Sequence, residues 1–547
     1  MADRISYFRQ KGDPYILGTG MALILTLGMV IFIVTVILVK GLGFFWPSDL
    51  LQADLPDRIY LGEVWDETSK RQTDRNGHII EIPEIQLKVG NRELYGSDFV
   101  WLDEAEVSQR KYPLAASTFE RYEFGNFYGY IRSVQMGDSV YSQEPKFMFD
   151  RAKDAHDIAL ENRSRKRAFE EELNELITPL SRLQREISLL EIETSAEKQA
   201  ELDELKQKAA HLETEISEKY LELSDEIQKL TRENEGIFVR VESADGKKTV
   251  IHLADVVRFY QPNDMNLFQK SVLYISKLWE FISANPRESN TEGGVFPAIF
   301  GTVLMVLLMS IAVVPFGVLA ALYLNEYAKQ GTIIRLIRLS VNNLAGVPSI
   351  VFGIFGLGFF IYMVGGTIDQ VFFSDKLPEP TFGTGGILWA SLTLALLTLP
   401  VVVVATEEGI LAVPRANKEG ALALGATRWQ MVRKIILPNA MPGILTGLIL
   451  AISRGAGEVA PLMITGVVKL APSLALDGVF PFLHLDRKFM HLGFHIYDVG
   501  FQSPNVEAAK PMVYTTALLL ILLVVCLNLL AIYMRNRLRK KYKTAVF

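Results

Sequence analysis

Two ionisable residues lie close together in a segment that is otherwise small and apolar. The run SRGAGEVAPLM places Arg454 and Glu458 four residues apart, so a helix would present both on one face. A charge at the centre of a bilayer costs roughly 2.5–3.5 kcal/mol on insertion scales, so two charges in one membrane span need a reason. An arginine offers a planar fork of donors for a tetrahedral oxyanion, and a glutamate can neutralise it between binding events. The pair therefore predicts either an anion pathway or a self-compensating structural contact.

Six apolar segments are long enough to cross a bilayer, and the fifth carries this pair. We expect spans at residues 15–39, 296–324, 339–364, 386–405, 442–468 and 512–534. The first is too long, and too poor in small residues at a cleavage site, for a removable signal peptide, so we interpret it as a retained anchor.

Basic residues orient the six spans, because loops rich in Lys and Arg stay in the cytoplasm. They cluster before the first span, between the second and third, after the fourth and after the sixth, as in Arg4, Arg9, Lys11, Arg335, Arg338, Arg415, Lys418, Arg535 and Lys540. All four clusters fall on one side if both termini are cytoplasmic. This predicts cytoplasmic ends at residues 1–14 and 535–547, a cytoplasmic loop at 406–441, and a large outer insertion at 40–290.

The loop between the fourth and fifth spans has a pattern of its own, EGALALGATRWQMVRKIILP from Glu419 to Pro438. It indicates a helix, a tight turn and a second short helix. Gly425 supplies the backbone freedom of the turn, and Pro438 is expected to stop the second helix.

This loop resembles the coupling loop of ABC-importer permeases, whose pattern is E-A-A, three residues, G, nine residues, I, one residue, L-P. The matching residues are Glu419, Ala421, Gly425, Ile435, Leu437 and Pro438, with Gly420 in place of the first alanine. In that family the loop docks into a groove of the ATPase subunit, so the resemblance implies an ATPase contact at these seven residues. The alternative is an ordinary amphipathic hairpin at the membrane surface.

Longer stretches resemble the PstA-type permease of the phosphate importer. They are SRGAGEVAPLM, TEEGILAVP, GVPSIVFGIFG and the run from His491 to Leu520, and the likeness covers the first span and residues 291–540. In that family an arginine and a glutamate here are implicated in phosphate passage, which implies pathway roles for Arg454 and Glu458. The resemblance also implies four kinds of partner: a second, PstC-type permease, a PstB-type ATPase dimer, a PstS-type phosphate-binding protein and membrane lipid.

The insertion at 40–290 is not covered by this resemblance and indicates an α+β domain. Asn76-Gly77 before an alternating run, and Asp245-Gly246 between two alternating runs, predict hairpins. Between them, residues 151–234 carry two heptad arms with a break near Glu193–Gln199, which predicts an antiparallel coiled-coil hairpin. Thr178-Pro179 suggests that the first arm is kinked or restarts there. A rigid spacer and a docking arm both remain open for this hairpin.

Several site classes have no support. The sequence contains no G-x-x-x-x-G-K-[ST] phosphate loop, so ATP hydrolysis is expected from separate subunits. It shows no nucleophile–base constellation, no nucleic-acid module and no cofactor motif. His491 and His495 have metal-ligand spacing if helical, but without an independent metal signature we expect no metal.

These observations predict an α-helical polytopic protein of the bacterial inner membrane. It would have six spans of the type-I ABC importer permease kind, with an outer α+β domain bearing a coiled-coil hairpin. We expect a permease subunit, not an enzyme, that imports phosphate by alternating access. A membrane-anchored scaffold or sensor, and a permease for another oxyanion, are the alternatives.

Overall fold

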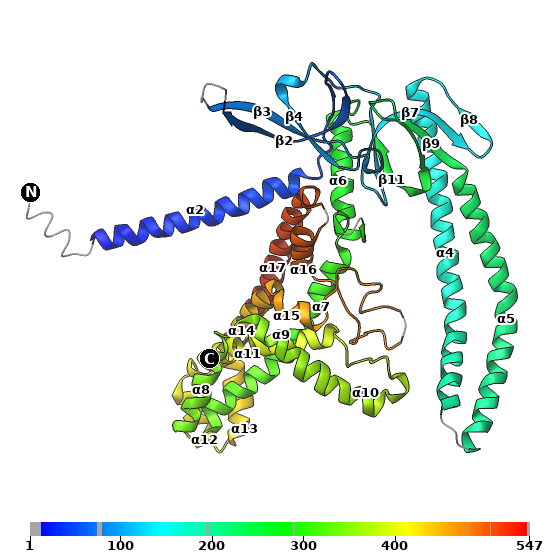
Figure 1. Ribbon diagram of the computed structural model, residues 1–547. Helices are drawn as coiled ribbons and strands as arrows, with labels where there is room; N and C mark the ends of the chain where they lie inside the picture. The colour runs from blue at the N-terminus through cyan, green and yellow to red at the C-terminus, as the bar shows by residue number, and fades with distance from the viewer. Residues whose placement is uncertain are drawn as a thin grey trace, which may run out of the picture. The chain divides into compact units, whose positions relative to one another are not determined.

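The computed structural model describes residues 13–73, 79–192, 196–287, 290–478, 480–503 and 505–543. It forms two compact units, coloured along the chain in Figure 1. The membrane unit contains Met1–Phe45 and Lys277–Phe547, and the insertion unit contains Trp46–Ser276.

Six helical stretches in the described part are long and apolar enough to cross a membrane, which confirms the predicted number. They are Tyr15–Gly43, Phe296–Tyr327, Ser349–Phe372, Ile387–Leu411, Arg428–Gly457 and Val506–Leu538. The corresponding elements are α2 (Asp13–Gly43), α7 (Phe296–Leu322) with the π-helix η4 (Tyr323–Tyr327), α9 (Ser349–Phe355) with η5 (Gly356–Gly365) and α10 (Gly366–Phe372), α11 (Ile387–Leu411), α13 (Arg428–Met431) with η7 (Val432–Ile436) and α14 (Leu437–Gly457), and α17 (Val506–Lys543).

Two predicted spans have the wrong bounds. The third was expected over residues 339–364, but α8 (Thr332–Leu344) is a separate amphipathic helix and α9 begins after Pro348. Proline disfavours helical geometry in the residue before it, so the chain breaks there. The fifth was expected to reach residue 468, but α14 ends at Gly457. Pro461 has no N–H to continue the helix, and a new short helix, α15 (Ala460–Thr465), begins beside it.

Helix α11 is the centre of the membrane unit and the most buried of the six spans. It packs against α7 and α14, and their side chains form the main apolar core around Met305, Leu394 and Ala451. The backbones of α11 and α14 approach closely, because a Cβ added to Gly443 would lie 2.6 Å from the Gly409 Cα. Small residues at such crossings are how helices pack in lipid.

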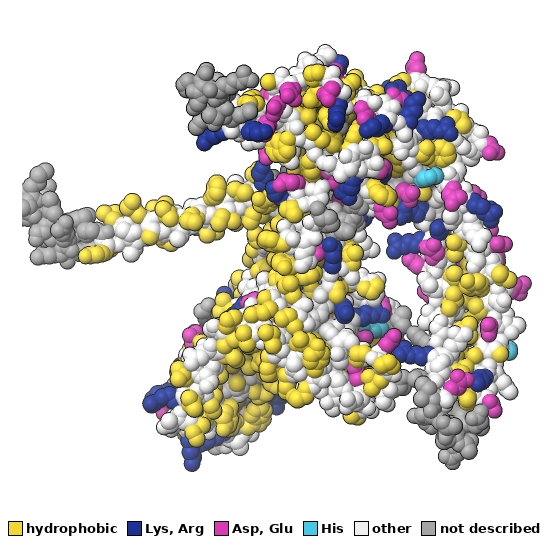
Figure 2. Space-filling view, in the orientation of Figure 1, with side chains coloured by type: hydrophobic (Ala, Val, Ile, Leu, Met, Phe, Trp, Pro, Cys, Tyr) yellow, Lys and Arg dark blue, Asp and Glu magenta, His cyan; other side chains and the backbone are white. Residues whose placement is uncertain are grey.

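Helix α2 joins the membrane unit at its C-terminal end. The Thr515 hydroxyl of α17 donates to the Gly41 carbonyl at 2.9 Å. The apolar side chains from Tyr15 to Ile33 are exposed along α2, as the hydrophobic surface in Figure 2 shows. Such a surface suits lipid or another membrane helix.

The insertion unit contains two antiparallel sheets. The first has the order β4-β3-β2-β1-β5, with β1 at Leu50–Asp54, β2 at Ile59–Thr73, β3 at Ile79–Lys88, β4 at Phe99–Asp103 and β5 at Gln109–Lys111. The second has the order β10-β9-β7-β6-β11, with β8 on β7; its strands are β6 (Ser117–Arg121), β7 (Phe127–Met136), β8 (Ser139–Tyr141), β9 (Ile237–Glu242), β10 (Lys248–His252) and β11 (Val256–Tyr260).

Both predicted hairpins are present. Strands β2 and β3 pair antiparallel, although Asn76-Gly77 between them lies outside the described residues. Strands β9 and β10 pair around Asp245-Gly246, where Gly246 has φ +84°. Only glycine takes that conformation without strain, so this turn is encoded locally.

Two long helices, α4 (Pro145–Ile192) and α5 (Ala196–Glu235), pack along each other where the two heptad arms were predicted. The expected break falls between them, and residues 193–195 lie outside the described part. The predicted restart at Thr178 is wrong, because α4 is continuous through Pro179 and the Thr178 hydroxyl donates to the Asn174 carbonyl at 2.6 Å. That bond belongs to a helix interior and not to an N-cap.

The remaining described helices are short or lie between the spans. They are α3 (Arg92–Tyr95), α6 (Leu267–Ser283), α12 (Arg415–Ala423) and α16 (Leu492–Tyr497), which leads into the π-helix η8 (Asp498–Gln502).

Candidate functional site

Arg454 and Glu458 lie together at the end of α14, as the sequence predicted. The Arg454 Nε atom is 3.6 Å from the Glu458 Oε1 atom, and the two side chains are 31% and 22% exposed. The expectation that both sit on one helix is wrong in detail. Glu458 follows the last helical residue and has extended backbone, with φ −79° and ψ 137°. The pair therefore spans the break that follows α14, at the end of the fifth membrane segment. Transporters use such interruptions of a helix to expose polar backbone to a substrate.

Neighbouring helices hold the turn that carries Arg454. A Cβ added to Gly455 would lie 2.5 Å from the Met309 Sδ atom of α7, so the Met309 side chain lies directly against this glycine. On the other side, the Asn528 side chain of α17 donates to the Ser453 hydroxyl at 2.8 Å. Nothing lies within 4 Å of a Cβ built at Gly457. The turn is thus fixed on two sides and open at the break.

The segment after the break is also held in place. A Cβ added to Gly353 of α9 would lie 2.8 Å from the Pro461 Cα, and one added to Gly356 would meet Thr393 and Thr465. The glycines of GVPSIVFGIFG thus let α9 and η5 pack on α15 and α11 within the chain. The break at Glu458 consequently lies between two rigidly packed parts.

The loop between α11 and α14 has the predicted helix–turn–helix form, and we call it the α12–α13 segment (residues 415–436). Gly425 follows α12 with φ +82°, which glycine adopts without strain. Thr427 then starts α13 with a capping box, in which its hydroxyl accepts from the Gln430 N–H at 3.2 Å. The prediction that Pro438 stops the second helix is wrong. Pro438 lies in the first turn of α14, where its missing N–H is tolerated, and the helix continues to Gly457.

The α12–α13 segment has an inner and an outer face. Ala421, Met431, Val432 and Ile436 are buried in one apolar cluster with the ends of α7 and α11, and Ile435 and Leu437 pack against that cluster. Glu419, Gly420 and Gly425 are exposed. The seven predicted contact residues therefore divide between the two faces, with Pro438 only partly buried in α14.

Two large apolar side chains on the outer face escaped the sequence prediction. Leu424 is 91% exposed and Trp429 is 58% exposed. The sequence offered one signal for them, a Leu and a Trp within a charged segment. Exposed apolar side chains of this kind usually mark an interface. In Figure 2, basic side chains gather at the end of the bundle where Figure 1 labels α8, α12 and α13.

His491 and His495 are four residues apart and buried, but they do not form a metal centre. The His491 Nδ1 atom accepts from the Gly493 N–H at 3.1 Å, and the His495 Nδ1 atom lies 3.3 Å from the Thr516 hydroxyl. Burial lowers the pKa of His491 to about 3 and that of His495 to about 4, so both rings are neutral near pH 7. Within the described ranges, no group of three His, Cys, Asp or Glu side chains could hold a metal ion.

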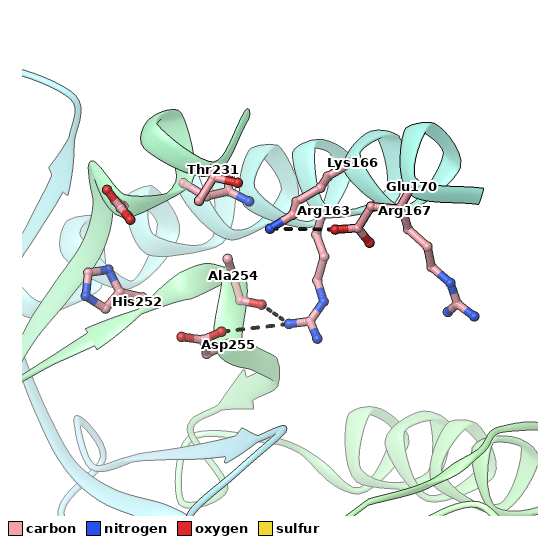
Figure 3. A pocket seen from close by; sticks show the side chains of 10 residues that line it. Arg163, Lys166, Arg167, Glu170, Thr231, His252, Ala254 and Asp255 are labelled. Carbon is pink, nitrogen blue, oxygen red and sulfur yellow. Dashed lines mark hydrogen bonds and ion pairs between the residues drawn. The ribbon is translucent and has the colours of Figure 1, made fainter. Parts of the chain in front are cut away.

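A cavity of about 640 Å³ lies in the insertion unit, where α4 and α5 meet the second sheet (Figure 3). Three basic residues line it, but so do three acidic ones, and each of the basic residues has an acidic neighbour. Arg163 donates to the Ala254 carbonyl at 2.5 Å and lies 3.9 Å from Asp255, while Lys166 lies 3.9 Å from Glu170. The cavity offers an anion no net positive charge, so it is a poor match for an oxyanion.

Comparison with known proteins places the membrane unit in one family. A family model described as "Binding-protein-dependent transport system inner membrane component" matches residues 313–541. The "Probable ABC transporter permease protein YqgI" of Bacillus subtilis (strain 168) is 30% identical over 268 residues, which cover 48% of this chain and 85% of that protein. The "Phosphate transport system permease protein PstA 1" of Mycobacterium tuberculosis (strain CDC 1551 / Oshkosh) is 35% identical over 244 residues, which cover 44% of this chain and 71% of that protein.

One further sequence match agrees in kind. The "Phosphate transport system permease protein PstA" of Yersinia pestis is 32% identical, over 46% of this chain and 75% of that protein. Among solved structures, the inward-facing MetNI methionine ABC transporter aligns with 48% of this chain and 98% of that one, at 18% identity and a TM-score of 0.32, which is too low to add to the assignment. On the sequence matches, this chain belongs to the binding-protein-dependent transport system inner membrane components: it is a multi-pass permease subunit of an ABC importer and not itself the ATPase.

Proposed function

We propose that this permease subunit imports inorganic phosphate. The observation that carries the proposal is the Arg454–Glu458 pair at the break that ends the fifth span, because it places a guanidinium where it could meet an oxyanion. The relatives named as phosphate transport permeases support the substrate class. A permease for another oxyanion would use the same chemistry, so the substrate assignment rests on those relatives.

In the proposed mechanism Arg454 exchanges one anionic partner for another. When the pathway is empty, Glu458 neutralises the guanidinium at 3.6 Å. An arriving phosphate offers several oxygens to the same planar fork of donors, which forms stronger, bidentate hydrogen bonds. Glu458 has extended backbone and no helix to unwind, so it can give way. The returning carboxylate then lowers the affinity for the anion and promotes its release.

The energy enters through the α12–α13 segment. We propose that its outer face, with Glu419, Leu424 and Trp429, docks into an ATPase subunit. Such exposed apolar residues bind well in a groove that removes them from water. Because η7 continues directly into α14, a displacement of this segment reaches the turn that carries Arg454. ATP-driven closure of the ATPase dimer would thereby switch the pathway between outward and inward access.

The proposed assembly has a second, PstC-type permease, a PstB-type ATPase dimer and a PstS-type binding protein in a bacterial inner membrane. Both termini and the α12–α13 segment would lie in the cytoplasm, and the insertion unit in the periplasm. Labelling of single cysteines at Leu424 and at Trp101 with an impermeant maleimide, in a Cys526→Ala chain, tests this orientation. Only the cysteine at position 101 should react from the outside of intact cells.

Within the insertion unit, we propose that α4 and α5 form a coiled-coil hairpin. The buried residues of α5 recur at heptad spacing: Leu202, Ala209, Ile216, Leu223 and Leu230. Lys219 also lies 2.7 Å from Glu172 across the two helices. Replacing residues 173–218 with a short Gly/Ser turn should therefore leave both sheets folded, because Glu172 and Lys219 already lie side by side; loss of the folded unit would argue against a self-contained hairpin.

The proposed function is tested by ATP-driven uptake of labelled phosphate in proteoliposomes that contain the complete complex. The scaffold or sensor alternative predicts assembly without uptake. Sulfate offered at the same concentration separates a phosphate permease from one for another oxyanion.

A further inference from the structure

A buried ion pair links the α12–α13 segment to the second membrane span. The Lys418 Nζ atom of α12 lies 2.6 Å from the Glu326 Oε1 atom of η4, the π-helix that ends this span. The two side chains are only 19% and 13% exposed. Lys418 also donates to the Ile410 carbonyl at the end of α11, at 3.4 Å. One lysine thus joins three elements at the end of the bundle where Figure 1 labels α8, α12 and α13.

The residues beside Glu326 extend this contact to the other helices. Asn325 donates to Glu407 of α11 at 3.1 Å, and Arg338 of α8 donates to the Asn325 side chain and to the Leu324 carbonyl, both at 3.2 Å. The Arg338 Nε atom is 3.5 Å from Glu407. The short stretch from Leu324 to Glu326 is therefore the common anchor of α8, α11 and α12.

The position of Lys418 is informative because its neighbour faces the other way. Glu419 is exposed on the outer face, whereas Lys418 is directed into the bundle. Beneath the ion pair, Ala421, Ile410 and Leu324 make apolar contacts, which are non-directional and permit sliding. A short charge-assisted bond is directional, and breaking it would strand two charges with little water. The Lys418–Glu326 pair is thus the contact that forces η4 to follow α12.

The second span also contacts the turn that carries Arg454. Met309 of α7 packs directly against Gly455, because a Cβ added to Gly455 would approach the Met309 Sδ atom at 2.5 Å. Gly455 is the residue after Arg454. A displacement of α7 therefore presses on the turn that holds the guanidinium.

We propose that Lys418 and Glu326 are positioning residues that couple the α12–α13 segment to Arg454 through α7. This second route runs beside the direct continuation of η7 into α14. The inference rests on the proposed function for the direction of transport. The mechanical link between α12 and α7 is a property of the permease alone. A pair that merely stabilised the loop would affect assembly, whereas a coupling pair affects what ATP does to the Arg454 turn.

The test uses charge reversal and its rescue in the complete complex. Lys418→Glu and Glu326→Lys each break the pair, and the double variant restores it with the charges exchanged. Lys329→Glu is the matched control, because Lys329 is an exposed lysine three residues after Glu326. The readouts are the amount of copurified ATPase and the phosphate transported per ATP hydrolysed. We expect each single reversal to keep its ATPase but to lower the transport ratio about tenfold, since a bond to a charged group is worth more than a factor of ten. The double variant and the control should stay within about twofold of the unmodified chain.

A second readout requires no substrate. A cysteine at Gly457, where the surrounding space is open, reports on the Arg454 turn in a Cys526→Ala chain. ATP with vanadate should change its rate of maleimide labelling in the parent complex and in the exchanged double variant, but not in either single reversal. If phosphate uptake is absent while this pattern holds, the proposed substrate is wrong and the coupling route stands. Equal labelling changes in all variants, a transport ratio that falls only in proportion to lost ATPase, or an exchanged pair that fails to restore it would overturn the inference.

Discussion

The Arg454 guanidinium lies 3.6 Å from the Glu458 carboxylate, although helix α14 ends between them at Gly457. The two charges therefore neutralise each other across a helix break and not along one helix face. Because the chain is extended at Glu458 and packed again from Ala460, the carboxylate can move while both flanking helices stay in place. The ion pair can therefore break and form again without a change in the stability of the span.

Glu458→Gln should make the pathway hold its anion too tightly. Without the competing carboxylate, Arg454 keeps its full charge for the anion, so both KM and kcat for phosphate uptake should fall. We expect each to fall about tenfold, which corresponds to about 1.4 kcal/mol of competition from the Glu458 carboxylate. The dependence of ATP-driven uptake on phosphate concentration measures both. Glu507→Gln, which removes an exposed partner of Lys510, is the control. A raised KM in Glu458→Gln would contradict the exchange of partners.

Gly425 and Gly420 should respond oppositely to alanine, although neither has any atom within 4 Å of an added Cβ. Gly425 has φ +82°, so alanine there should cost about 1–2 kcal/mol of backbone strain. Gly420 lies within α12, where alanine should gain about 0.5–1 kcal/mol. Thermal unfolding of the two purified variants in detergent compares them. Shifts of the same sign would show that the turn is not held as described.

Trp429→Ala should weaken the binding of the ATPase subunit without unfolding the permease. A large aromatic side chain at an interface is worth about 2 kcal/mol or more, so we expect a Kd about thirtyfold higher. Trp101→Ala serves as the matched control, because Trp101 is similarly exposed, at 47%, but lies on β4 of the insertion unit. If both variants retained the same ATPase complement, the outer face of the α12–α13 segment would not be the docking surface.

The insertion unit should lose stability in acid through the Glu93–Arg121 pair, whose closest atoms are 2.5 Å apart. Burial by itself would raise the pKa of Glu93, but the hydrogen bonds and charge of Arg121 outweigh it and lower the pKa below 4.5. Because the folded state binds the proton less readily, this contribution is present above about pH 4.5 and is lost as the pH falls further.

The substitution that isolates the contribution of the Glu93–Arg121 pair to stability is Glu93→Gln. The unfolding temperature of the parent chain should exceed that of the variant near neutral pH, and the difference should shrink below about pH 4.5. Glu104→Gln, which breaks the exposed pair with Arg110, controls for a general charge effect. A difference that stays constant down to about pH 3.5 would rule out this pair as the cause.

Periodic and local signals predicted much of this fold. The six spans follow from apolar length, the β9–β10 hairpin from Asp245-Gly246, and the α12–α13 turn from Gly425. Each depends on residues that are neighbours in the sequence. The two long helices α4 and α5 are of the same kind, because they lie where the sequence repeats apolar residues at helical spacing, and they pack along each other.

The errors in the predicted helix bounds arose at prolines, because the effect of a proline depends on the structure around it. Pro348 and Pro461 stand where a new helix begins after a break, whereas Pro179 and Pro438 lie within continuous helices. Proline always lacks its N–H, but whether the helix breaks depends on how the neighbouring helices pack. In the same way, the bond between Lys418 and Glu326 joins residues 92 positions apart, and no local pattern announces it.

The most direct measurement of the central claim is ATP-driven uptake of labelled phosphate by proteoliposomes holding the complete complex with Arg454→Gln. Asn528→Ala, which removes a partner of the same turn but leaves the charge, is the control. The account predicts that Arg454→Gln assembles with its ATPase and loses uptake by at least about tenfold, because a charged hydrogen-bonding group is removed from the pathway. Uptake equal to that of the parent complex, with the ATPase bound in both, would contradict it.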